Sequence, residues 1–396
     1  MIDPARLLAD LDELARIGAT ESGGVTRVAY SEADRAGREW VAAKLREVGL
    51  EVSADPAGNL IGRLEGAESL PPLAIGSHTD TVPEGGRFDG ALGVVAAIAC
   101  ARALAGGHKR LRHPLEVLDF ASEEATMSGG TLGSRAMSGQ WDAAMAGAPA
   151  WDGRPVREHL LEAGLDPGRI AAAARRPGSL AAYLELHIEQ GATLEQDGVQ
   201  IALVTGIVGI RRFAVTFEGE ANHAGTTPMD RRRDALVAAA PFVLHAREVA
   251  LRHGIVGTVG SLTVHPGASN VIPGRVELTA EIRGLDESVL DQAEAELGKA
   301  AELRLLSRKP PVECSPVLVD ALEGAARGLG LTSRRMPSGA GHDAMCVSAL
   351  CPVAMVFVPS RGGVSHSPLE FTAQEDCVNG TRVLLAALLD VDAELS

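Results

Sequence analysis

The stretch LAIGSHTDTVPEGGRFDGALG, residues 73–93, strongly constrains how this chain folds. It begins with apolar residues and a glycine, which predict a buried strand running into a loop, and a helix-like run follows it. His78, Asp80 and Asp89 lie in that loop, and an α/β sheet presents its chemistry just beyond the carboxyl ends of its strands. His78 and Asp89 are types that bind divalent metals, and Asp80 is placed to hold the far ring nitrogen of His78. A turn whose Asp and Gly residues serve only backbone geometry fits the stretch equally well.

Strands and helices alternate on both sides of this stretch. The apolar strand PLEVLDFASEE ends in Glu123 and Glu124, and the strand AAYLELHIEQG carries His187 at its end. Such alternation predicts an α/β domain with a mainly parallel sheet covered on both faces, formed by residues 1–207 and 315–396. Helices are expected over residues 3–17, 31–48, 91–105, 316–329 and 374–390.

The pattern changes at Gly206. The segment IRRFAVTFEG alternates strictly between apolar and polar residues, as a half-buried antiparallel strand should, and two further strands follow as TVGSLTVHPG and GRVELTAEIRG. This order predicts a compact two-layer α+β domain inserted over residues 208–314, with glycines and the Pro310-Pro311 pair marking its hinges. Its helices are expected over residues 227–253 and 287–305.

The charge balance excludes several classes of protein. Asp and Glu outnumber Lys and Arg by 52 to 37, so the net charge of −15 argues against nucleic acid or an anionic membrane as the main partner. The first residues, MIDPARLLADLDEL, predict neither a signal peptide nor a transit peptide. No apolar run approaches the roughly 18 residues that span a bilayer. The 5 cysteines form no C-x-x-C pair, which favours free thiols in a reducing cytoplasm.

Five potential metal ligands fall at or just after strand ends of the predicted α/β domain: His78, Asp89, Glu124, His187 and His366. A single histidine is more often a satisfied polar residue than a ligand, but so many such groups at one sheet edge indicate a metal centre. They are too many for one tetrahedral zinc and suit two divalent ions, Zn, Mn, Co or Ni, that share a bridging carboxylate. Glu123 is not needed as a ligand, so it can take a proton from water and pass it to a leaving nitrogen. The alternative for the Glu123-Glu124 pair is a solvated loop end.

Seven segments between Gly76 and Thr372 carry a resemblance that covers nearly the whole chain. They are GSHTDTVPEGGRFDGALGV, the Glu123-Glu124 pair followed by LGSRAMSG, LELHIEQG, GIVGIRRFAVTFEGEANHAGTTPM, PGASNVIPG, SGAGHDAM and GGVSHSPLEFT. Together they resemble the M20-type metallohydrolases, and within them the amidases that include N-carbamoyl-L-amino-acid hydrolases, β-ureidopropionases and allantoate amidohydrolases. The HIEQG and HAGTTPM segments are the most specific part of this resemblance.

The resemblance implies a ligand set for two divalent metals. Asp89 would bridge the ions, His78 and His187 would complete one site, and Glu124 and His366 would complete the other.

The resemblance also implies roles for the residues around the metals. Glu123 would be the general base, Asp80 would orient His78, and Gln190 would line the substrate pocket. The enzyme implied is an amidohydrolase that cleaves a linear amide or ureido C–N bond of a small carboxylate, with an N-carbamoyl-L-amino acid as the first candidate. Alternatives are an allantoate-type or ureidoglycolate-type amidohydrolase, an aminoacylase-like or dipeptidase relative, and a non-catalytic binding protein with the same fold.

By the same resemblance, the inserted domain would act as a lid and as the contact of a homodimer. His223 would reach the partner subunit's active site and polarise the substrate carbonyl, while Asn270 and Arg283 would hold the substrate carboxylate. An arginine suits that role because its planar fork matches a carboxylate bidentately. The alternatives are a rim charge for Arg283, a turn residue for Asn270 and a helix-start residue for His223.

One stretch departs from the carbamoylase pattern. After the Glu-Glu pair those enzymes usually carry Gly, a small residue, Arg and Phe, whereas this chain reads Ala125-Thr126-Met127-Ser128. Metal binding should survive because Glu123 and Glu124 are kept. A pocket that loses a cation and a ring can accept a different acyl group, so this stretch leaves the substrate's acyl group open.

Overall fold

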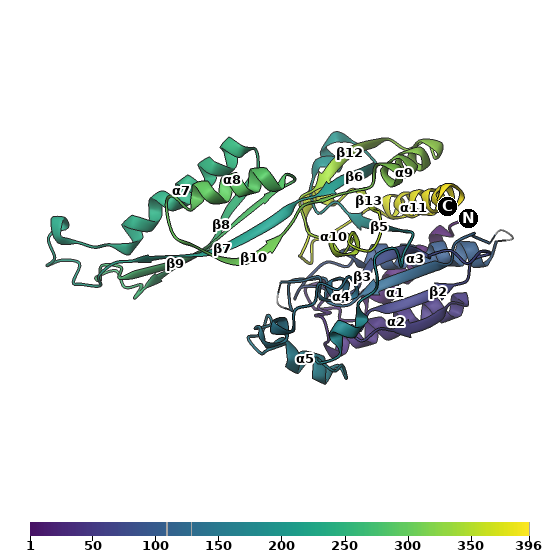
Figure 1. Ribbon diagram of the computed structural model, residues 1–396, viewed down its shortest axis with the longest axis horizontal. Helices are drawn as coiled ribbons and strands as arrows, with labels where there is room; N and C mark the ends of the chain where they lie inside the picture. The colour runs from purple at the N-terminus through teal and green to yellow at the C-terminus, as the bar shows by residue number, and fades with distance from the viewer. Residues whose placement is uncertain (108–109, 128, 396) are drawn as a thin grey trace. The chain divides into compact units, whose positions relative to one another are not determined.

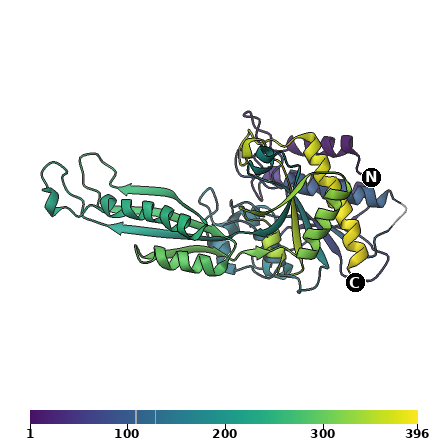
Figure 2. The ribbon, with the colours of Figure 1, turned by 90° about the horizontal axis from the view of Figure 1, so that it is seen from above.

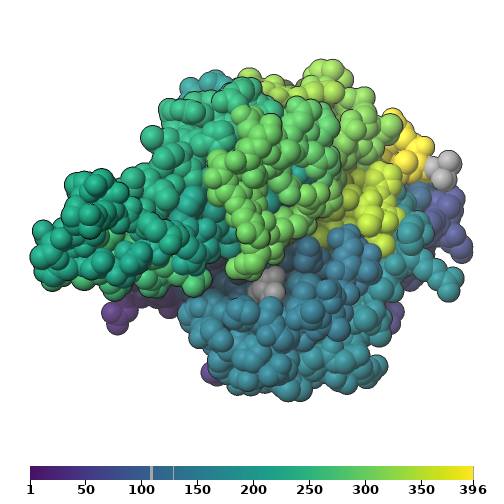
Figure 3. Space-filling model, turned by 60° about the vertical axis from the view of Figure 1, so that its left-hand side comes forward, coloured from purple at the N-terminus to yellow at the C-terminus, as the bar shows by residue number. Residues whose placement is uncertain are grey.

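The computed structural model describes residues 1–107, 110–127 and 129–395, which form two compact units (Figure 1). Unit 1 contains Met1–Thr205, Glu313–Ser338 and the chain from His342 onward. Unit 2 contains Gly206–Val312 together with the short loop Gly339–Gly341. Unit 2 spans the teal-to-green part of the colour scale (Figure 3).

Unit 1 is built on a 9-stranded sheet in the order β1-β2-β4-β3-β5-β13-β6-β11, with β12 pairing with β6. The strands are β1 (Glu51–Ala54), β2 (Leu60–Leu64), β3 (Leu73–His78), β4 (Leu115–Phe120), β5 (Ala182–Ile188), β6 (Ile201–Ile207), β11 (Val312–Glu313), β12 (Ser333–Ser338) and β13 (Val353–Val358). The central strands β4, β3, β5 and β13 are parallel, whereas β1, β2 and β6 pair antiparallel at the flanks. All four central strands are buried along their whole length, as parallel strands covered on both faces should be.

The register of the central strands brings their carboxyl ends to one edge of the sheet. His78 pairs with Phe120, and His187 pairs with Phe357, so β3, β4, β5 and β13 end close together. The loops that leave these strands therefore meet at this edge.

Helices and 3₁₀ turns complete unit 1. They are α1 (Pro4–Ala15), α2 (Glu32–Val48), α3 (Ala91–Ala105), α4 (Leu132–Met137), α5 (Val156–Glu162), α6 (Thr193–Asp197), α9 (Pro316–Gly328), α10 (Ala344–Val347) and α11 (Gln374–Glu394), with 3₁₀ turns at Ala143–Gly147, Ile170–Ala173 and Arg361–Gly363. The most buried of the long helices is α3, which packs on β3, β4 and β5 and is covered by α1, α2 and α11. Gly93 allows this close packing, because a Cβ there would lie 2.4 Å from the carbonyl oxygen of Leu186 in β5.

Unit 2 is a 4-stranded antiparallel sheet in the order β10-β7-β9-β8, with two helices against one face (Figure 2). Its elements are β7 (Gly209–Glu218), the 3₁₀ turn Met229–Arg231, α7 (Ala235–His253), β8 (Val256–His265), β9 (Arg275–Gly284), α8 (Glu287–Leu297) and β10 (Leu303–Lys309). Phe213 of β7 and Ile282 of β9 are buried against Phe242 of α7 and Leu290 of α8. The structure confirms two sequence predictions, a mainly parallel sheet in an α/β fold and a separate two-layer α+β fold.

The first helix of unit 2 begins later than expected. The sequence predicts a start at residue 227, but α7 begins at Ala235. The carboxylate of Asp234 accepts the backbone N–H groups of Leu236 and Val237 at 2.9 and 3.2 Å, and this cap fixes the start. The Thr227-Pro228 pair precedes a single 3₁₀ turn instead.

The second helix of unit 2 ends earlier than expected. The prediction of a helix over residues 287–305 is wrong beyond Leu297, where Gly298 is the C-cap. Residues Leu303–Lys309 form β10, which pairs with β7 and supplies the fourth strand of the sheet. Pairing with β7 satisfies the backbone groups that a longer helix would have satisfied internally.

Two sequence expectations about the chain's environment can be compared with the structure. No helix among the described residues is both long and apolar enough to cross a membrane. Cys100, Cys314, Cys346, Cys351 and Cys377 are all free and buried, as expected for unpaired thiols.

Candidate metal centre

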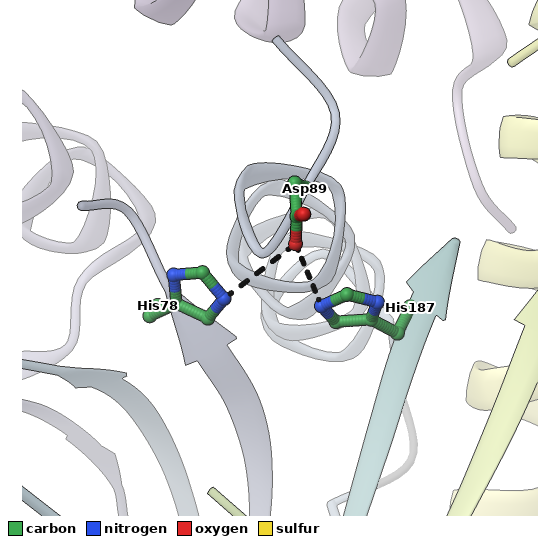
Figure 4. A group of neighbouring side chains, drawn as sticks. All are labelled: His78, Asp89 and His187. Atoms are coloured by element: carbon green, nitrogen blue, oxygen red, sulfur yellow. Dashed lines mark ion pairs between the residues drawn. The ribbon is translucent and has the colours of Figure 1, made fainter. Parts of the chain in front are cut away.

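The loops at the carboxyl edge of the unit 1 sheet bring the predicted ligands together. His78 ends β3, Asp89 lies in the loop that enters α3, and His187 lies near the end of β5 (Figure 4). Gly90 is required beside them, because it has a φ of +62° and a Cβ there would lie 2.4 Å from the His78 ring. Glu124 follows β4, and His366 follows β13.

The rings of His78 and His187 both point at the Asp89 carboxylate (Figure 4). Asp89 Oδ1 lies 3.1 Å from His187 Nε2 and 3.8 Å from His78 Nε2. The opposite ring nitrogens contact backbone carbonyls, with His78 Nδ1 3.0 Å from the oxygen of Asp80 and His187 Nδ1 2.9 Å from that of Ile188. Because a carbonyl can only accept, both Nδ1 atoms carry a proton, and each ring turns its Nε2 atom toward Asp89.

This arrangement fits a divalent cation. In a buried site, an unprotonated ring nitrogen and a carboxylate oxygen repel each other unless positive charge lies between them. His187 Nε2 makes no hydrogen bond among the described residues. Burial alone would lower the pKa of His78, but the surrounding carboxylates, led by Asp80, outweigh it and raise that pKa well above its usual value. The pKa of His187 is also raised, because Asp89 outweighs the effect of burial. The carboxylates around both rings thus favour positive charge at this site.

The second oxygen of Asp89 faces a second group of possible ligands. His366 Nε2 lies 3.4 Å from Asp89 Oδ2 and 3.4 Å from Glu124 Oε1. Burial raises the pKa of Glu124, and the neighbouring Asp89 carboxylate raises it further. The pKa of Asp89 is held well below its usual value because His187 and His366 outweigh its burial. Asp89 therefore lies between two groups that could each hold a metal, His78–Asp89–His187 and Asp89–Glu124–His366.

Glu123 lies beside these groups without belonging to either. Its Oε2 atom is 3.7 Å from His78 Nε2. The carboxylate of Asp80 accepts the backbone N–H groups of Glu123 and Glu124 at 3.0 and 3.1 Å. Asp80 thus orients His78 mainly through its backbone carbonyl, since its carboxylate is 3.6 Å from His78 Nδ1, and uses that carboxylate to fix the Glu-Glu pair.

Gln190 contacts a candidate ligand directly. The resemblance implies that Gln190 lines the substrate pocket, and in the structure its Nε2 donates to Asp89 Oδ2 at 2.7 Å. Gln190 has a φ of +57°, an uncommon conformation for a residue other than glycine, as does His366 with +54°. Backbone strain of this kind often accompanies functional loops.

Sequence reasoning missed a further set of polar residues behind the ligands. His342 packs edge-on against His187, with ring centroids 4.6 Å apart, and its Nε2 lies 2.8 Å from Ser338 Oγ. Glu185 accepts hydrogen bonds from Ser77 at 2.8 Å and Tyr183 at 3.1 Å. Glu185 could have been found from the alternation of β5, which places it on the same face as His187.

The stretch that departs from the carbamoylase pattern lies partly in the core. Met127 is fully buried in an apolar cluster with Leu132 and Leu160, so its side chain packs in the protein interior. Thr126 is also buried, and its hydroxyl makes no hydrogen bond among the described residues. Ser128 lies outside the described residues.

The other predicted substrate residues belong to unit 2. His223 Nδ1 accepts the backbone N–H groups of Gly225 and Thr226 at 3.0 and 3.2 Å, so the neutral ring carries its proton on Nε2 and presents a donor there. The His223 segment pairs with that of Asn270, whose carbonyl accepts the N–H of Ala224.

Arg283 lies at the opposite end of unit 2 from His223 and Asn270. It donates to Glu281 Oε1 at 2.6 Å and to the carbonyl of Gly339 at 2.8 Å, and it lines a hollow of about 610 Å³. Arg275 begins β9 just after the Asn270 loop, and Arg283 almost ends that strand. At about 3.4 Å per residue, the two ends of β9 are roughly 27 Å apart.

Comparison with known proteins identifies the family. Residues 74–390 match the model of peptidase family M20/M25/M40. The chain belongs to this family. This M20 chain is 43% identical over 398 residues to an N-carbamoyl-L-amino acid amidohydrolase of Geobacillus stearothermophilus, with 97% of each chain covered. It is 37% identical to an allantoate amidohydrolase of Bacillus subtilis, with 94% of each covered.

Solved structures agree with this assignment. The M20 chain superimposes on an amidase of the hydantoinase/carbamoylase family from Burkholderia multivorans with a TM-score of 0.88 and 36% identity, covering 100% of this chain and 99% of that one. These two relatives are amidohydrolases, which act on C–N bonds other than peptide bonds, and the M20 chain is an enzyme of that class.

Proposed function

We propose that this M20 chain hydrolyses a linear amide or ureido C–N bond of a small carboxylate, with an N-carbamoyl-L-amino acid as its substrate. The observation that carries the proposal is the position of Asp89, whose two oxygens face two separate groups of ligand types while Glu123 lies beside them. The relative from Geobacillus stearothermophilus, which matches along almost the whole chain, supports the choice of substrate.

The proposed cofactor is a pair of divalent ions, Zn, Mn, Co or Ni. His78, Asp89 and His187 would hold one ion, and Asp89 would be shared with Glu124 and His366 for the other. Such mixed nitrogen and carboxylate ligation suits these metals. Bound there, the ions supply Lewis-acid chemistry that acidifies water and polarises a carbonyl oxygen.

Glu123 is the proposed general base. Its carboxylate would take the proton of the attacking water and later deliver it to the departing nitrogen. The N–H bonds to Asp80 hold the backbone of Glu123 while its side chain accepts and returns the proton. With a carbamoyl substrate, the products would be an amino acid, ammonia and carbon dioxide.

Unit 2 is proposed to bind the substrate carboxylate through Arg283 and Asn270 and to polarise its carbonyl through His223. The length of β9 supports a contribution from two chains, because residues roughly 27 Å apart within one unit cannot both contact one small molecule. His223 and Asn270 of one chain and Arg283 of the other would therefore contact the same substrate.

A homodimer through unit 2 is the proposed assembly. β8 is an edge strand of the sheet, and most of its residues are exposed. A long exposed edge strand is a template for pairing with a second copy of the chain. Exposed apolar residues on the neighbouring α7, among them Val237, Leu244 and Leu251, would be covered by the same association. A cytoplasmic location is also proposed, on the free thiols.

A second candidate substrate is allantoate. The Bacillus subtilis relative supports it, and the acyl group is left open because Met127-Ser128 stand where carbamoylases usually carry Arg and Phe. The deciding experiment measures ammonia and amine release from a panel of N-carbamoyl, N-acetyl and N-formyl amino acids, allantoate and ureidoglycolate. Fastest turnover of N-carbamoyl-L-amino acids supports the proposal, and fastest turnover of allantoate selects the second candidate.

A further inference from the structure

The buried side chain of Glu370 holds the loop that carries Asp89. Glu370 Oε1 accepts the backbone N–H groups of Phe88 at 2.8 Å and Asp89 at 3.0 Å, across 282 and 281 residues of sequence. Its side chain fills a space that only glycine leaves open, because a Cβ at Gly86 would lie 2.0 Å from the Glu370 carboxyl group. Glu370 is 4% exposed, so these bonds are shielded from water.

The same carboxylate also reaches the loop of His366. Glu370 Oε2 lies 2.9 Å from the hydroxyl of Ser365, the residue before His366. That hydroxyl is also 2.9 Å from Asp89 Oδ2. Ser365 is thus placed between two carboxylates, and its single proton can be donated to only one of them at a time.

Two hydrogen-bond donors compete with a cation for the lone pairs of Asp89 Oδ2. Gln190 Nε2 lies 2.7 Å and Ser365 Oγ 2.9 Å from this oxygen. A carboxylate oxygen has about two lone-pair sites, and these two donors occupy both when the Ser365 proton points at Asp89. If Asp89 Oδ2 is to bind a cation together with Glu124 and His366, one donor must turn away.

Ser365 can turn away at the smaller cost. Its Oγ already lies within hydrogen-bond distance of Glu370 Oε2, so only the hydroxyl proton has to rotate. Gln190 would have to move its whole amide group, and its other acceptor, Ser365 Oγ, is 3.4 Å from its Nε2.

We propose that Glu370 is a positioning residue that takes the Ser365 hydroxyl bond when Asp89 Oδ2 binds a divalent cation. The proposal rests on the proposed function, because it requires a cation at Asp89, Glu124 and His366. By accepting the Ser365 proton, Glu370 frees one lone pair of Asp89 while its Oε1 keeps the Asp89 loop in place. Metal binding and the positions of the Asp89 and His366 loops are thereby linked through one carboxylate.

The test uses the isosteric variant Glu370→Gln. Its amide oxygen can still accept the N–H groups of Phe88 and Asp89, but its NH₂ group faces Ser365 as a donor. The Ser365 hydroxyl must then accept from residue 370 and donate to Asp89 Oδ2, where it competes with the cation. We expect Zn²⁺ affinity, measured by competition with a chromogenic chelator on the full-length protein, to fall by about 10–100-fold, the usual effect of losing a partner behind a metal ligand.

Asp392→Asn is the matched control. Asp392 is another buried carboxylate that accepts two successive backbone N–H groups, those of Arg112 at 3.0 Å and His113 at 2.9 Å. These groups precede β4, at the sheet edge opposite the metal centre. Asp392→Asn should leave Zn²⁺ affinity unchanged, and the metal-free thermal unfolding midpoint is recorded for both variants to separate altered metal binding from altered stability.

Removing the hydroxyl provides a second test that does not depend on Glu370. Ser365→Ala should bind Zn²⁺ at least as tightly as the wild type, because one competitor for Asp89 Oδ2 is gone. In the double variant with Glu370→Gln, affinity should return to within about threefold of Ser365→Ala, since single-variant effects are not additive for contacting residues.

Three results would overturn the inference. These are a wild-type Zn²⁺ affinity in Glu370→Gln, a double variant as weak as Glu370→Gln alone, and weaker binding by Ser365→Ala. Wild-type protein that binds no divalent cation would overturn the proposed function together with this inference. Tight binding by the wild type and by Glu370→Gln alike would overturn the inference alone.

Discussion

The Asp80 carboxylate accepts the backbone N–H of Glu123 at 3.0 Å, across a sequence separation of 43 residues. The same carboxylate accepts the N–H of Glu124, so one side chain at the end of β3 fixes the backbone of both glutamates after β4. Asp80 is almost fully buried, and a charge-assisted bond in such surroundings is stronger than one in water. The proposed base Glu123 and the proposed ligand Glu124 are thus held in a fixed relation to His78.

Glu123→Gln should separate metal binding from catalysis. Glutamine keeps the size of the side chain and cannot take up a proton, so both metals should be retained while turnover falls at least about 10²-fold. Metal content and steady-state rates are measured on the same preparation. The control is Glu65→Gln, an exposed glutamate paired with Arg63, which should behave as the wild type. Near-normal turnover of Glu123→Gln would mean that another group is the base.

Arg283→Ala should weaken recognition of the substrate carboxylate. Loss of a charge-assisted hydrogen bond should cost about 1.5–3 kcal/mol in kcat/KM for an acid substrate. A substrate amidated at its carboxylate should be poor for the wild type and little affected by the substitution. The control is Arg308→Ala, which removes an exposed arginine of β10 that pairs with Glu294 of α8. Equal rates for acid and amide substrates in the wild type would show that Arg283 does not bind the substrate carboxylate.

Subunit mixing should reveal an active site built from two chains. Glu123→Gln and His223→Ala are each expected to be inactive, but a random mixture contains about half heterodimers on the symmetry of a two-fold dimer. Each heterodimer has one site with both lesions and one with neither, so activity should recover to roughly a quarter of the wild type. Recovery is read after subunit exchange has been verified by mass. Activity that stays at the level of the parents would place His223 in its own chain's site or in none.

Asp34 should make stability depend on pH. Burial raises its pKa to about 7, although Arg38 opposes the shift, and its Oδ2 accepts the backbone N–H of Tyr30 at 2.7 Å. Because the folded pKa lies above the unfolded value of 3.8, the native state holds the extra proton. The resulting stability is present in full below the unfolded pKa and is lost as pH rises to about 7.

The measurement for Asp34 is urea unfolding of the wild type and Asp34→Asn at pH 5 and pH 8. Asparagine cannot ionise, so the free energy of unfolding of the variant should gain roughly 2–3 kcal/mol relative to the wild type between these pH values, at about 1.4 kcal/mol per pH unit up to pH 7. A difference that does not change with pH would show that Asp34 is ionised throughout this range.

The ligand types of the metal centre could be predicted because they follow from the order of strands. His78, Glu124 and His187 each follow an apolar strand, and the carboxyl ends of parallel strands share one edge. The structure brings these residues to one place, and their role as ligands stays a prediction. The bonds behind them could not be predicted, because Glu370 acts on backbone N–H groups 281 and 282 residues away, and a sequence pattern carries no sign of such acceptors.

The errors in unit 2 have a similar cause. The Thr227-Pro228 pair has the composition of a helix start, but the side chain of Asp234 provides the cap. Leu303, Leu305 and Leu306 suit a helix as well as a strand, and only pairing with β7 decides between them. Local patterns predicted both helices and the strands β7, β8 and β9 of this unit, whereas the helix limits and the strand β10 depend on tertiary contacts.

Metal analysis joined to an activity assay decides whether hydrolysis by this chain depends on divalent ions. Elemental analysis of purified protein is made before chelation, after chelation and after adding back Zn²⁺ or Mn²⁺, with ammonia release from an N-carbamoyl-L-amino acid measured on each sample. The account predicts about two equivalents of divalent metal per chain, loss of activity on chelation and recovery on addition, since the chemistry of the site depends on the ions. Protein that remains fully active while retaining no metal would contradict it.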